Sequence, residues 1–138
     1  MSRNSEVMSK VSGLCAFPEI TATVIKSIQE LKPEAAQKLF KVSDALWTEV
    51  AAMWGNDLES FTNPEVGLRG LRAYTGEAFK FLNAAELSPE GSSNAQQSLY
   101  IMSALYGVVS ANMHIVPYRL EMQSRLEVAS YKNLTSLW

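Results

Sequence analysis

The sequence predicts an α+β fold in which N-terminal helices precede a small mixed sheet. Apolar residues recur every three to four positions in the first half of the chain, which is the period of an amphipathic helix. Residues 99–109 instead form a nearly continuous apolar run, and residues 118–122 alternate apolar and charged side chains, as strands do. A chain of 138 residues with 47% apolar content is long enough for one domain and one core.

The first half of the chain is expected to be an arm followed by three helices. Residues 1–16 are polar and lack a period, so we predict a flexible N-terminal arm and a single domain over residues 17–138. The three helices are expected over residues 18–31, 33–40 and 43–54. Pro18 and Pro33 suit a first helical turn, Ser43 is a good N-cap, and Gly55 suits a helix end. Residues 56–65 are expected to form a loop.

The second half is expected to combine short helices with buried strands. Residues 77–82 predict a short helix, and residues 88–94 predict a turn-rich loop in which Ser93 or Asn94 caps a brief helix through Ser98. The predicted central strand covers residues 99–109. A second strand is expected over residues 118–122, and a terminal helix begins at residue 132.

Composition restricts the function classes. The net charge of −2 and the pI of about 5.4 argue against a protein whose whole surface binds nucleic acid, although they leave room for a local basic patch. Cys15 is the only cysteine, so an intrachain disulfide and the usual zinc cluster are excluded. No apolar stretch approaches the roughly 18–20 residues of a membrane span. We expect an intracellular, cytoplasmic protein.

Two short motifs in the second half resemble one protein family. The run Ser103-Ala-Leu-Tyr-Gly107 and the run Pro117-Tyr-Arg-Leu-Glu-Met122 resemble signatures of the YaaA family, whose members are associated with peroxide stress and DNA binding. Further similarity lies at residues 38–46, 72–79 and 132–138. The motif residues are Ser103, Tyr106, Gly107, Pro117, Tyr118, Arg119 and Glu121.

The resemblance implies a truncated YaaA-like core. Family members are longer at both ends, so we expect an incomplete domain, and Ser110–Met113 stands where the family has an Arg-Pro-Leu-Asp turn. The ambiguous pattern of residues 67–74 is interpreted as a buried strand, because the family has a strand there. The resemblance also implies a role linked to the peroxide stress response.

Nucleic-acid binding is the first functional hypothesis. The resemblance implies DNA binding, and no base-reading element is visible, so we predict weak, electrostatic and non-enzymatic binding that is lost between about 50 and 200 mM salt. The alternative for these charges is ordinary solvation. The candidate DNA-binding residues are Arg69, Arg72, Lys80, Arg119, Arg125 and Lys132.

The second hypothesis is a structural subunit of a larger assembly or a homo-oligomer. In this interpretation the open sheet and an apolar surface pack against a protein partner, with Trp47, Trp54 or Trp138 near the contact. No catalytic residue, metal ligand or cofactor is predicted.

Several side chains have both a functional and a structural interpretation. Arg119 and Glu121 either position a phosphate or form a structural ion pair, and Tyr106 either stacks on a ligand or fills the core. His114 is interpreted as a turn residue, and Cys15 as an incidental thiol.

Overall fold

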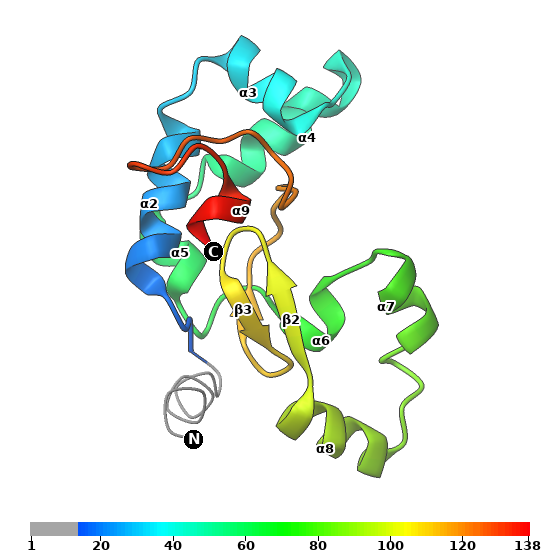
Figure 1. Ribbon diagram of the computed structural model, residues 1–138. Coiled ribbons are helices and arrows are strands. Elements are labelled where there is room, and N and C mark those ends of the chain that lie inside the picture. The colour runs from blue at the N-terminus through cyan, green and yellow to red at the C-terminus, as the bar shows by residue number, and fades with distance from the viewer. Residues whose placement is uncertain (1–13) are drawn as a thin grey trace.

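The computed structural model describes residues 14–138 (Figure 1). It confirms the α+β prediction, with a mostly helical N-terminal half followed by short strands. Figure 1 shows the β2–β3 hairpin between the N-terminal helices and a second group formed by α6, α7 and α8. The predicted arm, residues 1–16, lies mostly outside the described residues. Cys15, near its end, packs against the core.

The three helices that open the described part of the chain begin where the sequence predicts. Their bounds are Pro18–Gln29 for α2, Pro33–Phe40 for α3 and Asp44–Trp54 for α4. The proline at the start of α2 and of α3 occupies a position whose N–H needs no partner. Ser43 precedes α4 in an extended conformation, but its side chain makes no capping hydrogen bond.

The expected loop over residues 56–65 contains a helix, so that prediction was wrong in part. Helix α5 covers Leu58–Thr62. The Asp57 carboxylate accepts the backbone N–H of Ser60 at 2.8 Å, which satisfies a free donor of the first turn. The hydrogen bonds that Asp57 accepts from the Ser60 N–H and hydroxyl lower the pKa of its carboxyl group. Phe61, on the same short helix, is buried in the core.

The strand expected over residues 67–74 is mostly helical. Strand β1 covers only Leu68–Arg69, and helix α6 follows at Gly70–Ala73. The chain turns because the N–H of Gly70 donates to Met113 O at 2.7 Å and the N–H of Leu71 donates to Ala111 O at 3.0 Å. These two bonds attach the start of α6 to the segment that leads into strand β4, His114–Ile115.

The single central strand expected over residues 99–109 is a hairpin. Strand β2, Tyr100–Ser103, pairs antiparallel with β3, Gly107–Ser110, so that Ile101 faces Val109. The apolar residues 104–106 form the turn. The strands therefore make two antiparallel pairs, β1–β4 and β2–β3, and not one mixed sheet.

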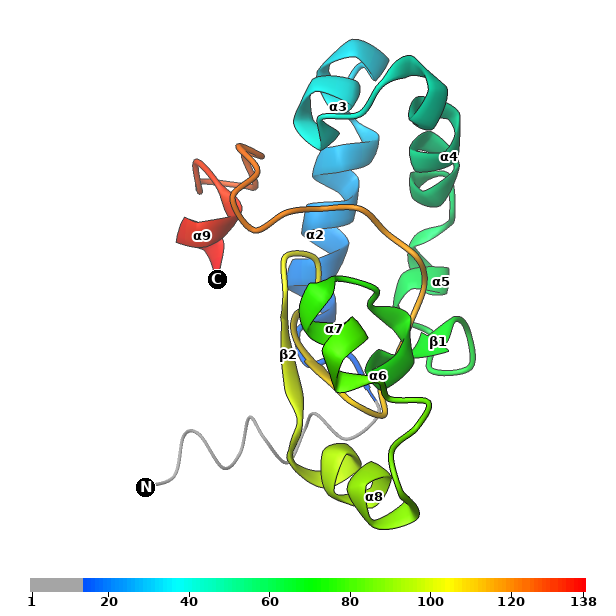
Figure 2. The ribbon, with the colours of Figure 1, turned by 90° about the vertical axis from the view of Figure 1, so that its right-hand side faces the viewer.

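The strand expected over residues 118–122 does not form. This segment has no strand partner among residues 14–138, yet its burial alternates as predicted. Tyr118, Leu120 and Met122 are half-buried, whereas Arg119 and Glu121 are exposed. In Figure 2 the segment crosses in front of α2 as an extended chain. The period-2 pattern therefore reflects the packing of one side of this segment on the core. It does not indicate hydrogen-bonded pairing with another strand.

The remaining helices are short. Helix α7 covers Glu77–Leu82, as predicted, and α9 covers Leu134–Leu137 near the chain end. Helix α8 covers Pro89–Ser98, so the loop expected over residues 88–94 was wrong. Its N-cap is Ser88, whose Oγ accepts the N–H of Gly91 at 3.0 Å, and not Ser93 or Asn94.

The core joins both halves of the chain. Its N-terminal part includes Val24 and Ile25 of α2 and a stack in which Trp54 lies between Phe40 and Phe61, with centroid distances of 5.6 and 5.8 Å. Residues from the hairpin, the extended segment and α9 complete it. Within residues 14–138, no helix has both the length and the apolar character that crossing a membrane would require.

Candidate functional site

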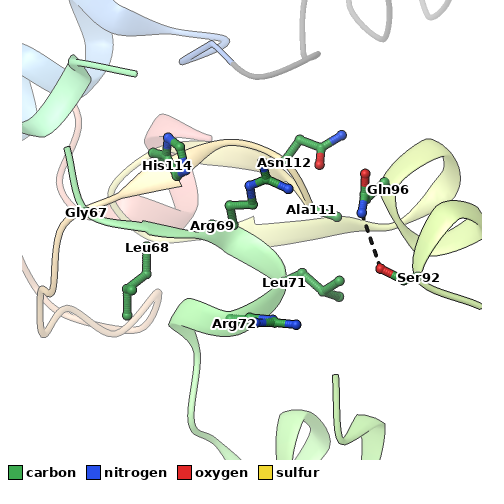
Figure 3. Close-up of a pocket in the computed structure, with 10 residues that line it drawn as sticks. All are labelled: Gly67, Leu68, Arg69, Leu71, Arg72, Ser92, Gln96, Ala111, Asn112 and His114. Atoms are coloured by element: carbon green, nitrogen blue, oxygen red, sulfur yellow. Dashed lines mark hydrogen bonds between the residues drawn. The ribbon is translucent and has the colours of Figure 1, made fainter. Parts of the chain in front are cut away.

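A polar cavity of about 390 Å³ opens where β1 and α6 meet α8 and the turn between β3 and β4. Figure 3 shows its walls: Arg69 extends toward Asn112, His114 lies on the same side, and Ser92 and Gln96 face it from α8. The residues that line it are Gly67, Leu68, Arg69, Leu71, Arg72, Ser92, Gln96, Ala111, Asn112 and His114.

Two glycines bring the arginine-bearing segment against the neighbouring strands. Gly67 has φ +94°, and a Cβ there would lie 2.1 Å from the carbonyl oxygen of Ile115. A Cβ on Gly70 would lie 2.6 Å from the carbonyl oxygen of Ser110. Because only glycine allows both approaches, the Gly67-Leu-Arg-Gly70 run fixes Arg69 at the wall of the cavity.

Arg69 and His114 are direct neighbours across the β1–β4 pair. Directly opposed residues of antiparallel strands project on the same face, with Cβ atoms about 5 Å apart. The His114 Nδ1–H donates to the backbone carbonyl of Pro64. This bond holds the imidazole ring in place and leaves Nε2 as the ring nitrogen available to a ligand.

The electrostatics of the cavity favour an anion. Two arginines line it, and none of its described lining residues is acidic. Within residues 14–138, neither Arg69 nor Arg72 has a carboxylate partner within ion-pair distance. The wall from α8 is polar, since Gln96 Nε2 donates to Ser92 Oγ at 3.2 Å. Guanidinium groups beside amide and hydroxyl groups match the oxygen atoms of a phosphate.

The six basic residues proposed for DNA binding do not gather in one place. Arg69 and Arg72 share the polar cavity, whereas Lys80 lies on α7 and pairs with Glu77 at 3.8 Å. Arg125 lines a different cavity together with Lys38 and Lys41. Arg119 and Lys132 are exposed and line neither cavity. Of the six residues, the structure therefore brings only Arg69 and Arg72 together in one cavity.

The motif residues form a buried hydroxyl network at the hairpin turn. Ser103 Oγ accepts the N–H of Tyr106 at 2.9 Å and the N–H of Leu105 at 3.2 Å. The same oxygen lies 2.8 Å from Tyr118 Oη, which in turn lies 3.1 Å from Tyr74 Oη. Burial raises the pKa of Tyr118, Tyr106 and Tyr74 above the ordinary value, so these hydroxyls keep their protons to a higher pH than an exposed tyrosine does.

Gly107 and Tyr106 also hold the turn, whereas Glu121 makes its contact elsewhere. Gly107 has φ +73°, and the Trp138 ring packs so closely that a Cβ would lie 2.6 Å from it. Trp138 Nε1 donates to the carbonyl of Ala104 at 2.9 Å, and Tyr106 is fully buried. Glu121 pairs with Lys41 at 3.7 Å, not with Arg119, and both partners are well exposed. The contacts therefore support the core alternative for Tyr106, whereas Arg119 and Glu121 form no ion pair with each other in residues 14–138.

The three tryptophans proposed for an interface lie in different environments. Trp54 is buried in the core of this chain, so its ring is not available to a partner. Trp138 is half-buried against Phe17, with ring centroids 5.7 Å apart. Trp47 is half-buried and packs against the edge of the core.

Sequence reasoning missed the polar half of the cavity wall. The sequence predicts a loop at Ser92, a brief helix at Gln96 and a turn at Asn112, and it gives none of these three residues a role. The available signal was the Gly67-Leu-Arg-Gly70 run, in which two glycines flank an arginine. Among residues 14–138, no three His, Cys, Asp or Glu side chains are grouped closely enough to hold a metal ion. The Cys15 Sγ lies 3.5 Å from Thr21 Oγ1.

Comparison with known proteins places the chain in a family. The family described as peroxide stress protein YaaA matches residues 2–138. The chain is 35% identical over 122 residues to a UPF0246 protein of Limosilactobacillus fermentum, covering 88% of this chain and 48% of that protein. It is 36% identical over 115 residues to a UPF0246 protein of Shewanella denitrificans, covering 83% of this chain and 44% of that protein.

A UPF0246 protein of Clostridioides difficile is 29% identical over 136 residues, covering 99% of this chain and 53% of that protein. The chain thus spans about half the length of the curated relatives it matches. The family match extends over nearly all of the 138 residues and includes both the Ser103–Gly107 and the Pro117–Met122 motifs. The chain therefore belongs to the peroxide stress protein YaaA family.

Proposed function

We propose that this protein acts in the peroxide stress response as a non-enzymatic DNA-binding protein, and that the cavity at Arg69 and Arg72 holds a backbone phosphate. The observation that carries the proposal is the pair of guanidinium groups without carboxylate partners in a cavity whose described lining contains no acid. Most protein contacts to DNA are made to phosphate and sugar, and arginine supplies them without reading sequence.

The number of arginines in the cavity sets the salt dependence that we expect for DNA binding. Each neutralised phosphate contributes a slope of about −0.9 to the logarithm of the binding constant against the logarithm of salt concentration. Two contacts therefore weaken binding about tenfold between 50 and 200 mM salt. Six contacts, as the full set of candidate residues would give, predict a far steeper loss.

The test is fluorescence anisotropy with a labelled duplex of about one to two helical turns, titrated at several salt concentrations. We expect Arg69→Ala/Arg72→Ala to weaken binding about tenfold or more at low salt and to flatten the salt slope by about 2. Arg119→Ala/Arg125→Ala removes the same charge elsewhere and serves as the control. An equal loss in the control, or no binding by the unsubstituted chain at low salt, would contradict the proposal.

A second candidate function is a subunit that binds another polypeptide. It is favoured by the large apolar side chains that the described surface exposes, among which Phe81 is 87% and Met102 is 70% exposed. Exposed apolar area of this kind marks interaction surfaces. The two functions use different surfaces, because neither Phe81 nor Met102 lines the arginine cavity.

A further inference from the structure

The arginine cavity, which Arg69 and Arg72 line, holds more hydrogen-bonding groups than an internal DNA phosphate can use. An internal phosphodiester offers two free oxygen atoms and one negative charge. A phosphate monoester at the end of a strand offers three acceptor oxygen atoms and a charge of about −1.5 to −2 at pH 7. The donors of the cavity therefore match a monoester better than a diester. Besides the two arginines, the polar side chains that line it are Ser92, Gln96, Asn112 and His114.

These polar groups differ in exposure. Both arginines are exposed, whereas the other four polar side chains are half-buried. An internal phosphate carries a sugar on two sides, and the duplex keeps it at the protein surface, where it contacts the exposed guanidinium groups. A terminal phosphate is tethered on one side only, so it can enter the cavity and contact the half-buried groups as well. The half-buried groups are therefore the ones that distinguish the end of a strand from its middle.

Helix α8 contributes two donor hydrogens to the cavity. Gln96 Nε2 donates one of its hydrogens to Ser92 Oγ at 3.2 Å, as the dashed line in Figure 3 shows. The second hydrogen of this amide remains, and the Ser92 hydroxyl, which accepts the bond, keeps its own hydrogen to donate. Gln97 Nε2 likewise donates to Ser93 Oγ at 3.2 Å, but neither of these two side chains lines the cavity. The helix thus carries the same pair of side chains twice, once at the cavity and once outside it.

His114 supplies an acceptor that suits a monoester. Its Nδ1–H donates to the carbonyl of Pro64, so Nε2 of the neutral ring carries a lone pair. A phosphate monoester takes up its second proton at about pH 6, and the P–OH group so formed can donate to Nε2. A phosphodiester binds no proton near neutral pH. The imidazole therefore accepts a hydrogen bond that the end of a strand can donate and an internal phosphate cannot.

We propose that the arginine cavity binds the terminal phosphate monoester of a DNA strand in preference to an internal phosphodiester. In this arrangement Arg69 and Arg72 balance the charge of the phosphate. The half-buried side chains of Gln96, Asn112 and His114 contact its oxygen atoms. The cavity volume of about 390 Å³ lies in the range of small-molecule sites, so there is room for the phosphate and the sugar attached to it. The inference rests on the proposed DNA binding at this cavity and specifies which phosphate is bound.

The test is fluorescence anisotropy with three duplexes of one sequence, whose strand ends carry 5′-phosphate groups, 3′-phosphate groups or hydroxyl groups only. The dye is attached to a central base, so that it leaves every end free. We expect the chain to bind one of the phosphorylated duplexes about tenfold or more tightly than the hydroxyl duplex at low salt. One additional hydrogen bond to a charged group changes a dissociation constant by about this factor.

A free mononucleotide carries the same monoester without a duplex. Thymidine 5′-monophosphate and thymidine 3′-monophosphate therefore serve as competitors against the phosphorylated duplexes. We expect both to bind more weakly than the preferred duplex, because they lack its other backbone phosphates, and we expect thymidine not to compete. Tighter binding of a mononucleotide than of the duplex would show that the cavity takes a free nucleotide, and it would overturn the assignment to a DNA end.

Two matched variants of α8 test where the strand end lies. Gln96→Ala removes a side chain that lines the cavity, and Gln97→Ala removes the same side chain outside it. Gln96→Ala should reduce the preference for the phosphorylated duplex by at least about threefold, whereas Gln97→Ala should leave the preference unchanged. Asn112→Ala and His114→Phe, which alter other walls of the cavity, should reduce it as Gln96→Ala does. Near-UV circular dichroism checks that each variant keeps the fold.

Equal affinity for the three duplexes would overturn this inference, and it would leave the proposed function in place if the double arginine variant still weakens binding. A preference that survives all three cavity variants would also overturn it, because the strand end would then lie outside the cavity. The proposed function fails by a different result, in which the arginine variant and its control bind the hydroxyl duplex alike. A lack of binding by every duplex would contradict both.

Discussion

The β2–β3 hairpin and the helical segment of residues 77–98 are adjacent in sequence but differ in burial. In the hairpin, every residue from Ser103 to Gly107 is buried, and the turn is fixed by side-chain hydrogen bonds. In the helical segment no residue is buried. Helix α8 is held by the cap at Ser88, and α7 ends at Asn83 in a left-handed conformation. The hairpin is therefore held in place by side-chain packing, whereas residues 77–98 are held mainly by hydrogen bonds within their own helices.

This difference bears on both candidate surfaces. The arginines of the cavity stand on segments bonded to the core strands, whereas Ser92 and Gln96 stand on the unburied helix α8. Regions with few buried contacts open at low cost in free energy. We therefore expect the arginine side of the cavity to be preformed and the α8 side to adjust to a ligand. The exposed Phe81 ring of α7 stands on the same weakly anchored segment.

The largest effect on the free energy of unfolding is expected when a buried side chain of the hairpin and an exposed side chain of α7 are each truncated. Leu105 is fully buried in the hairpin turn, and Phe81 is 87% exposed on α7. Leu105→Ala should lower the free energy of unfolding by about 2–5 kcal/mol, from lost transfer energy and the cavity left behind. Phe81→Ala should change it by less than about 0.5 kcal/mol. Urea unfolding measures both, and similar losses would show that α7 is buried in solution.

A second contrast uses glycines of the two regions. Gly107→Ala forces a Cβ into positive φ, at a cost of about 1–3 kcal/mol, and displaces the Trp138 ring. Gly76, the N-cap of α7, has φ −62°, and a Cβ there would meet the Phe79 ring at 3.9 Å, an ordinary van der Waals contact. Gly76→Ala should therefore be within about 0.5 kcal/mol of the unsubstituted chain. Tryptophan fluorescence during urea unfolding reports both, and a neutral Gly107→Ala would refute the close approach of Trp138.

The helices were predictable because their signals are local. Pro18, Pro33 and the apolar spacing after them determine α2 and α3 within about one helical turn. The hairpin was missed because its turn residues Ala104-Leu105-Tyr106 are all apolar, and the one turn signal beside them, Gly107, stands inside an apolar run. The buried turn is possible because Ser103 Oγ accepts two of its N–H groups, a bond pattern that periodicity does not show.

The site was only partly predictable for a related reason. Arg69 and Arg72 stood out as charges, but the pairing of Arg69 with His114 joins positions 45 residues apart. Their sequence separation gives no sign of that contact. The alternation of residues 118–122 predicted the burial correctly and the strand wrongly, because a period of two reports one apolar side and not the presence of a pairing partner.

The smallest expected effect concerns the hydroxyl group that ties the hairpin to the Pro117–Met122 motif. Burial raises the pKa of Tyr118 above its ordinary value of 10.0. In the unfolded chain this hydroxyl ionises near pH 10, whereas in the folded chain it keeps its proton to higher pH. The contribution of the protonated Tyr118 hydroxyl to the free energy of unfolding is therefore complete below about pH 10, and it is lost as the pH rises above that value.

Tyr118→Phe removes the bonds to Ser103 and Tyr74 and should cost about 0.5–1.5 kcal/mol at pH 7. The variant cannot ionise at this position, so the difference between the two proteins should narrow as the pH rises from 9.5 to 11. Urea unfolding across that range measures it, with the exposed Tyr131→Phe as the control that should follow the unsubstituted chain at every pH. A difference that stays constant with pH would mean that water reaches the Tyr118 hydroxyl, and the hairpin turn would then be as open as the helical segment beside it.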